Sequence, residues 1–157
     1  MPDIGALLDG ATPRELAVTV CLDGTAAARL AELHDQRAQA TDWQPASLAD
    51  VDPVAALDEE IAQARAAVAE ACVEFRFRAI PYTQFTALLA AHPPAAGRPD
   101  LYDEETFLPA VLAACCVAPT LSAGQVGQLL DRVNHGTAKA LFDAALAVNE
   151  EPSPLPF

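Results

Sequence analysis

Hydrophobic residues alternate with small or polar ones in two short stretches of the chain, residues 15–22 and 72–80. A period of two places successive side chains on opposite faces of a strand. The positions on the expected core face are Leu16, Val18, Val20 and Leu22 in the first stretch and Val73, Phe75, Phe77 and Ala79 in the second. The pattern therefore predicts two β-strands, each with one buried face.

A helical pattern fills the interval between these strands, in residues 25–40 and 54–71. Its seam positions recur three and four residues apart, which is typical of coiled-coil packing. They are Ala26, Leu30, Leu33 and Arg37 in the first stretch and Val54, Leu57, Ile61, Ala64 and Val68 in the second. The opposite faces are charged. We therefore expect an antiparallel helical hairpin, called the arm below, with Trp43 in its connecting loop.

Residues 81–150 predict a helical body of about four helices. The helices are expected to begin near Pro81, Asp103, Ser122 and Thr137. Proline suits a first helical turn, acidic residues complement the helix dipole, and Ser122 with Gln125 resembles a capping box. Residues 134–136 are expected to end the third of these helices. Residues 151–157 contain three prolines and predict an extended, flexible tail.

These elements predict an α+β, mostly helical fold in a single domain of residues 1–157. A two-stranded antiparallel sheet with the inserted helical hairpin occupies residues 14–80, and a bundle of about four C-terminal helices covers it. Two strands alone are marginal in water, so the helices are expected to pack on the face of Phe75 and Phe77.

Composition narrows the classes of partner. The chain has 22 acidic and 9 basic residues and a formal net charge of -13, so its average surface repels nucleic acid and anionic lipid. The longest apolar runs, such as residues 110–117, are too short to cross a bilayer. Its four cysteines form no CxxC pair, and no signal segment precedes them, which favours a reducing cytoplasm. We expect no nucleic-acid and no membrane partner.

Candidate chemistry is sparse. His34, His92 and His135 are isolated from one another in sequence, and each suits an exposed or capping role. Cys115 and Cys116 could be a redox pair, but buried cysteines acting as small hydrophobes fit the neighbouring apolar helix better. Consecutive acidic residues on a helix point in different directions and do not converge on a metal. We therefore expect a protein that is not an enzyme and has no catalytic, cofactor-binding or metal-binding residues.

Protein binding is the remaining hypothesis, and several residues are candidates for it. Arg76 and Arg78 could meet an acidic partner or pair within this chain. Trp43 could anchor an interface or act as a local staple. The grooves between the last three helices have the widest apolar faces, and the tail could dock as an extended segment. The candidates for partner binding are Trp43, Arg76, Arg78, Leu129, Leu141, Leu155 and Phe157.

Several segments together resemble the tail assembly chaperones of long-tailed actinobacterial phages and prophages. The similar segments are Val73-Glu74-Phe75-Arg76-Phe77-Arg78-Ala79-Ile80-Pro81, Phe85, Leu88-Leu89, Ala91-His92-Pro93-Pro94, Thr106-Phe107-Leu108-Pro109-Ala110-Val111-Leu112, Ala114-Cys115-Cys116 and Ala144-Ala145-Leu146-Ala147-Val148-Asn149. The resemblance implies a factor in the bacterial host cytoplasm that binds the tape measure protein and assists tail tube assembly. It also implies no cofactor, and often a longer frameshifted product.

Three alternatives stay open at this point. A structural virion subunit, such as a head-to-tail adaptor or tail accessory protein, would form stable rings. An enzyme would require converging histidine and carboxylate groups in a cleft. An antitoxin-like inhibitor would have a small basic partner. Homo-oligomerisation is compatible with the sequence.

Overall fold

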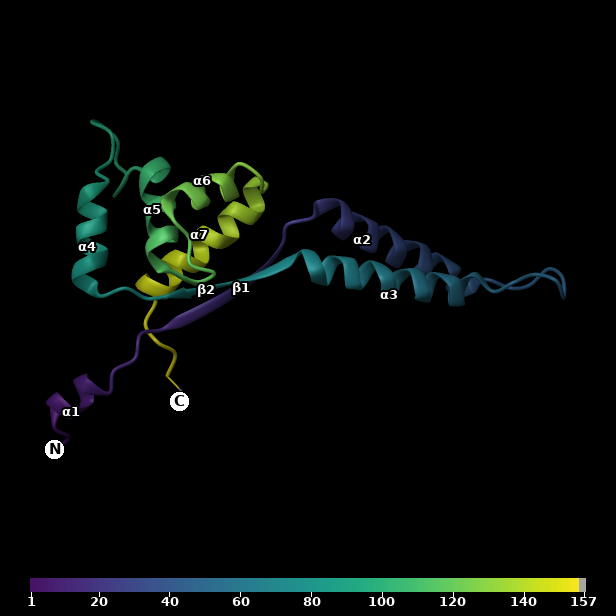
Figure 1. Ribbon diagram of the computed structural model, residues 1–157, viewed down its shortest axis with the longest axis horizontal. Helices are drawn as coiled ribbons and strands as arrows, with labels where there is room; N and C mark the ends of the chain where they lie inside the picture. Colours follow the sequence, from purple (N-terminus) through teal and green to yellow (C-terminus); the bar gives the residue numbers. More distant parts are fainter. Residues whose placement is uncertain (156–157) are drawn as a thin grey trace. The chain divides into compact units, whose positions relative to one another are not determined.

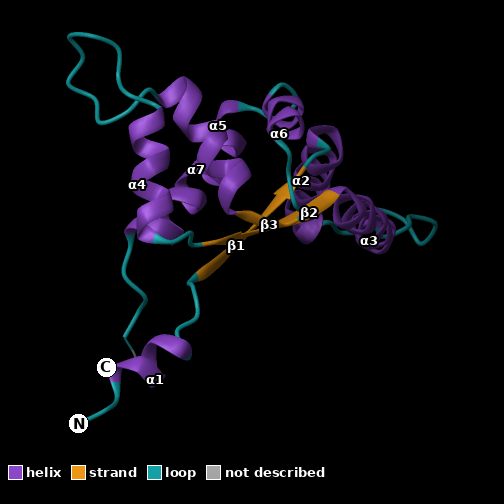
Figure 2. Cartoon of the chain, turned by 60° about the vertical axis from the view of Figure 1, so that its left-hand side comes forward, coloured by secondary structure: helices purple, strands orange, loops and turns teal. Residues whose placement is uncertain are grey.

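The computed structural model describes residues 1–155 of the chain. In this range it contains seven α-helices and a three-stranded antiparallel sheet of order β1-β2-β3 (Figure 2). The strands are β1 (Glu15–Cys21), β2 (Cys72–Arg78) and β3 (Cys116–Ala118). The helices are α1 (Ile4–Asp9), α2 (Gly24–Gln39), α3 (Pro53–Ala71), α4 (Tyr82–Ala91), α5 (Glu104–Cys115), α6 (Ala123–Leu130) and α7 (His135–Glu150), with a short 3-10 helix, η1 (Ala40–Asp42), after α2 (Figure 1).

The chain divides into two compact units. Unit 1 comprises Met1–Val18 and Glu74–Phe157, and unit 2 comprises Thr19–Val73. The division falls within β1 and β2, so each strand contributes to both units. Unit 2 contains the arm, and unit 1 contains the helical body.

The two predicted strands are confirmed with slightly earlier ends, and so is the alternation within them, but the prediction for Leu22 is wrong, because it follows β1 and is exposed. In β2, Phe75 and Phe77 are buried, whereas Glu74, Arg76 and Arg78 are exposed. The strand period of two thus separates the core side of the sheet from its solvent side. In Figures 1 and 2, α5 and α7 lie side by side over β2.

The prediction of a two-stranded sheet is wrong, because the three-residue strand β3 joins it. Its register places Cys116 opposite Phe77 and Ala118 opposite Arg76, with a bulge between them. A segment of three residues is too short to show alternation. Its pairing with β2 is therefore visible only in the folded chain.

The helical hairpin of the arm is confirmed, and so is its seam. Leu33 of α2 and Ile61 of α3 are the buried residues of these helices. The other predicted seam positions are half-buried: Ala26, Leu30, Arg37, Val54, Leu57, Ala64 and Val68. Ion pairs flank the seam, from Arg29 to Glu60 at 2.9 Å and from Arg37 to Asp58 at 2.7 Å. Because these pairs are exposed, each contributes only up to about 1 kcal/mol, so apolar packing stabilises the hairpin more than the ion pairs do.

The core of unit 1 is centred on aromatic and aliphatic residues of α5 and α7. Phe107 is fully buried, and its ring makes edge contacts with Phe85 at 6.1 Å and with His92 at 6.2 Å between ring centroids. Tyr102 packs closer, with its ring centroid 4.3 Å from that of Phe107. One phenylalanine thus ties α4 and the following loop to α5.

The boundary between the last two helices differs from the prediction. The capping box is confirmed, with the N–H of Gln125 donating to Ser122 Oγ at 3.2 Å. However, α6 ends at Leu130, and Asn134 begins α7 because its side chain accepts the N–H of Thr137 at 2.8 Å. Asparagine is a strong N-cap residue, and here it opens the next helix instead of closing the previous one. The predicted bundle of four helices is also inexact, since β3 lies between α5 and α6 and α1 is a further helix.

Two polar side chains that the sequence did not single out hold the end of α7. Arg14 donates to the carbonyls of Ala147 at 3.0 Å and Glu151 at 3.1 Å, so it adds hydrogen bonds at the C-terminus of α7, where the helix backbone satisfies few carbonyls by itself. Asn149 accepts the N–H of Ile80 at 2.9 Å and donates to Cys115 Sγ at 3.1 Å. The last helix is therefore fixed to both the strand ends and α5.

Candidate partner-binding surface

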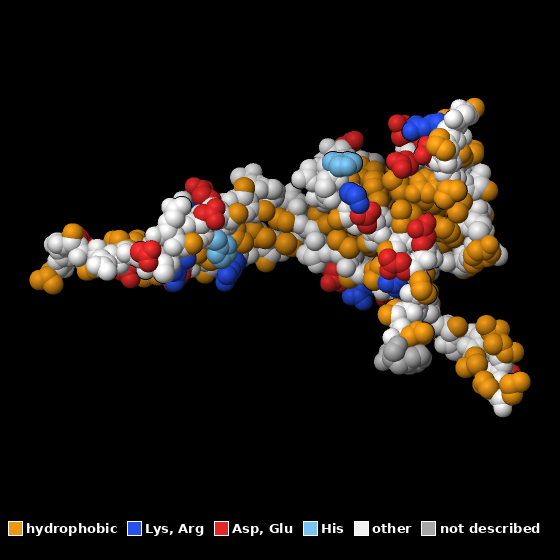
Figure 3. Space-filling view, turned by 180° about the vertical axis from the view of Figure 1, so that it is seen from behind, with side chains coloured by type: hydrophobic (Ala, Val, Ile, Leu, Met, Phe, Trp, Pro, Cys, Tyr) orange, Lys and Arg blue, Asp and Glu red, His pale blue; other side chains and the backbone are white. Residues whose placement is uncertain are grey.

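An apolar groove lies between α5 and α7 in unit 1. It has a volume of about 320 Å³. Its apolar wall is formed by half-buried side chains, and the residues at the groove are Tyr102, Leu108, Ala138, Phe142 and Leu146 with Glu104, His135, Lys139 and Asp143. In the space-filling view, hydrophobic side chains cover much of this unit, in the right-hand part of the picture, and charged side chains interrupt and border them (Figure 3). We call this feature the α5/α7 groove.

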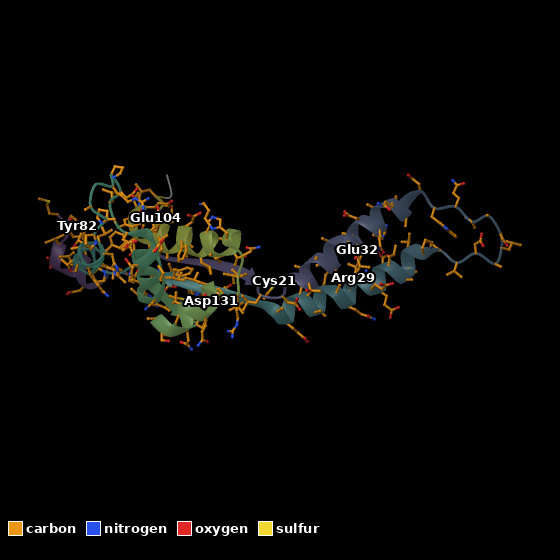
Figure 4. The ribbon with its side chains drawn as sticks, turned by 90° about the horizontal axis from the view of Figure 1, so that it is seen from above. Cys21, Arg29, Glu32, Tyr82, Glu104 and Asp131 are labelled. Carbon is orange, nitrogen blue, oxygen red and sulfur yellow. The ribbon has the colours of Figure 1, made fainter. Side chains whose placement is uncertain are left out.

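The rim of the α5/α7 groove carries negative charge. Lys139 forms an ion pair with Asp143 one turn away, which neutralises the rim's lysine. Glu104, labelled in Figure 4, forms no ion pair with another described residue. A second hollow, of about 360 Å³, shares Tyr102 and Glu104 with the groove. Its lining residues are Ala95, Arg98, Asp100, Tyr102, Asp103, Glu104 and Glu105.

Burial and nearby carboxylates both act on the Tyr102 phenol. Burial raises the pKa of the Tyr102 phenol, and the charges of Glu150 and Glu104 raise it further. Like an ordinary phenol, this hydroxyl is protonated at neutral pH and can donate a hydrogen bond. An apolar groove beside uncompensated carboxylates favours a partner surface that is apolar with cationic edges.

The structure corrects the choice of groove residues. Leu141 is 0% exposed and belongs to the core, so it cannot contact a partner. Leu129 is half-buried on α6 and does not line the α5/α7 groove. Apolar residues spaced three and four positions apart correctly identified the apolar face of α7. That face is wider than the strip of it that packs into the core. Phe142 and Leu146 lie at the edge of this apolar face, and they replace Leu141 as candidate partner-binding residues.

Arg76 and Arg78 form pairs within this chain. Arg78 donates to Glu15 Oε1 at 2.7 Å, and Arg76 donates to Glu74 at 2.9 Å. The hydrogen bond and charge of Glu74, with the charge of Glu15, raise the pKa of Arg76. Of the two interpretations left open by the sequence, pairing within the chain is the one seen. Both side chains are exposed, so these pairs are weak.

The remaining candidates lie apart from the groove residues in the sequence. Trp43 follows η1 in the arm, and its N–H donates to the carbonyl of Ala40 at 3.1 Å. Its exposed fraction of 36% lies between the high exposure expected of an interface anchor and the low exposure expected of a side chain tucked against its own loop. Leu155 is 72% exposed in a segment without helix or strand, and Phe157 lies outside the described residues.

The residues considered for catalysis lie in ordinary structural settings. His34 and His135 are exposed on helices, while His92 ends α4 against Phe107. Burial raises the pKa of both the Cys115 and Cys116 thiols, which keeps them protonated and weakly nucleophilic. Within residues 1–155, no group of three or more His, Cys, Asp and Glu side chains is placed to hold a metal ion. None of the helices described has both the length and the apolar character that crossing a bilayer requires.

Comparison with protein-family models, curated proteins and solved structures gave no match.

Proposed function

We propose that this protein is a phage tail assembly chaperone that binds apolar helical segments of another protein and performs no catalysis. The client is the tape measure protein, and the tail tube protein is a second partner. The sequence resemblance suggests this class, and the α5/α7 groove supports it. The place of action is the cytoplasm of the bacterial host.

The observation that carries the proposal is a groove of helix-binding character on the helical body. Two helices expose half-buried Leu108, Phe142 and Leu146 along one depression, where an amphipathic helix could place its apolar face. The acidic rim favours lysine or arginine on the flanks of that helix. A net charge of -13 keeps such a holder soluble while it carries an apolar client.

Co-expression with the tape measure protein tests the proposal. We expect the long protein to be insoluble alone and to co-elute with this chain when both are produced, as measured by affinity capture and size-exclusion chromatography. The double substitution Phe142→Gln with Leu146→Gln should reduce capture by about tenfold or more, as is typical for central anchors of an interface. Ala140→Gln, on the exposed side of the same helix, is the matched control and should capture normally.

A virion subunit is the second candidate, and one observation favours it. Helix α1 buries none of its residues and exposes Ile4, Leu7 and Leu8, which recur at helical spacing and suit self-association. This candidate predicts that the purified chain alone forms rings of defined symmetry. Two independently soluble proteins that never co-elute, with rings of this chain by electron microscopy, would replace the chaperone proposal.

A further inference from the structure

Two of the four cysteines face each other where the arm begins and ends. Cys21 is the last residue of β1, and Cys72 is the first residue of β2. Helix α2 starts shortly after Cys21, and α3 ends immediately before Cys72. Figure 4 shows Cys21 at the point where the strand gives way to the arm. Both thiols are free and partly exposed, so a small reagent can reach them.

The backbone hydrogen bonds define how these cysteines are paired. The N–H of Leu22, just after β1, donates to the carbonyl of Ala71, just before β2, at 3.0 Å, as expected beside an antiparallel strand pair. This bond implies a register in which Cys21 stands opposite Cys72 in a non-hydrogen-bonded pair, and the bond from the N–H of Ala79 to the carbonyl of Arg14 fits the same register. The N–H of Cys72 accordingly turns away from β1 and donates to the carbonyl of Ala69.

This pairing has the geometry that a disulfide needs. Residues of a non-hydrogen-bonded pair have Cα atoms about 4.5 Å apart, with their side chains on the same face of the sheet. Disulfides span Cα separations of about 4.4–6.8 Å. The pKa of the Cys72 thiol is raised in part by Cys21, which fits two thiols that lie close together. An ordinary non-hydrogen-bonded pair therefore meets the Cα requirement of a disulfide.

We propose that Cys21 and Cys72 are a modification site that takes a peroxide as a two-electron oxidant and closes a disulfide across the root of the arm. One thiolate attacks the O–O bond, forming a sulfenic acid and releasing hydroxide, which takes up a proton. The second sulfur then displaces the sulfenic hydroxyl as water and forms the S–S bond. Two thiols lose two electrons and two protons, and one peroxide becomes two waters.

The environment of Cys21 and Cys72 determines how fast they are oxidised. Partial burial raises the pKa of the Cys72 thiol, and the neighbouring Cys21 raises it further. Oxidation is therefore slow at neutral pH and faster at alkaline pH, because the thiolate is the attacking species. The resulting disulfide encloses the whole arm in a covalent loop, which limits the unfolded states of α2 and α3.

Peptide mapping of the intact full-length chain tests this inference. Purified protein is treated with hydrogen peroxide, blocked with a maleimide and digested with trypsin without reduction. We expect a cross-linked pair of the peptides 15–29 and 66–76, which contain Cys21 and Cys72 respectively. Cys115 and Cys116 occur in a different peptide and are buried, so they serve as an internal control. The thermal midpoint of the oxidised protein should rise by about 5 °C or more.

Three single variants separate the proposed bond from other oxidation. Cys21→Ser and Cys72→Ser should each abolish the cross-linked peptide and the rise in thermal midpoint, whereas Cys115→Ser should retain both. Intermolecular dimers as the main product, or four thiols that oxidise at similar rates without the 15–29 to 66–76 link, would overturn the inference. The readout is independent of any client, so its failure leaves the chaperone proposal untouched.

Discussion

Leu33 illustrates how a single side chain stabilises the arm. It is 1% exposed and is the buried residue of α2, so its removal leaves a cavity in the seam. Leu33→Ala should lower the free energy of unfolding of the arm by about 2–5 kcal/mol, the usual cost of truncating a buried leucine. Urea unfolding followed by circular dichroism measures this loss. His34→Ala, on the exposed side of the same helix, is the control and should change the free energy of unfolding by less than about 0.5 kcal/mol. If both substitutions lowered it equally, Leu33 would not be a buried seam residue.

The buried thiols of Cys115 and Cys116 predict an alkaline limit of stability. Burial raises both pKa values above the ordinary value of 9.0, so the folded chain holds these protons after the unfolded chain has lost them. Their contribution to stability is therefore complete below about pH 9 and is lost as pH rises through the folded pKa values. The free energy of unfolding should decrease as the pH is raised from 7 to 10.5. It should decrease less steeply with pH in Cys115→Ala. An unchanged slope would contradict the burial of this thiol.

Capping decides where the short helix α6 begins. The side chains of Ser122 and Gln125 each accept a backbone N–H from the other residue, at 3.2 and 2.9 Å. Ser122→Ala should lower the free energy of unfolding by about 1 kcal/mol, whereas Ser122→Asp should retain most of it. Thermal unfolding of the wild type, Ser122→Ala and Ser122→Asp at one pH tests this order of stability. Ser153→Ala, which lies after the last helix, is the control and should unfold like the wild type.

One of the side chains that hold helix α7 joins it to two other parts of the fold. Asn149 bonds to Ile80 after β2, to Cys115 at the end of α5 and to Ala145 within its own helix. Asn149→Leu should lower the free energy of unfolding by about 1–3 kcal/mol, since it leaves the half-buried N–H of Ile80 without its acceptor. Hydrogen exchange of the Ile80 amide measures the local effect. Protection of that amide equal to the wild type would show that another group replaces Asn149.

Across the whole molecule, charge should modulate client binding without creating it. The chain carries a net charge of -13, and the α5/α7 groove combines an apolar wall with an acidic rim. Raising salt from about 0.05 M to about 0.5 M should weaken capture of a basic amphipathic client several-fold, because screening shortens the reach of the rim charges to a few ångströms. Apolar burial should preserve a residual, salt-resistant affinity. Affinity measured across this salt series, with Phe142→Gln plus Leu146→Gln as the variant that lacks the apolar wall, separates the two contributions.

Elements with a regular hydrophobic pattern over several residues, or with a strong N-cap, could be predicted from the amino-acid sequence. The two seven-residue strands, the seam around Leu33 and Ile61, and the Ser122 capping box all follow from residue spacing. These features are local, because a strand or helix period acts on residues a few positions apart. Net charge and the absence of a long apolar run are likewise properties of the chain alone.

Features that depend on contacts between distant segments emerged only in the folded chain. Strand β3 exists because Cys116 lies opposite Phe77, and three residues carry no period that would have revealed it. The same holds for the hydrogen bonds of Arg14 and Asn149, for the cross-strand pairing of Cys21 with Cys72, and for the burial of Leu141. A hydrophobic pattern shows which side of a helix is apolar, but only packing determines which part of that side remains at the surface. For this reason the candidate groove residues on α7 are Phe142 and Leu146 and not Leu141.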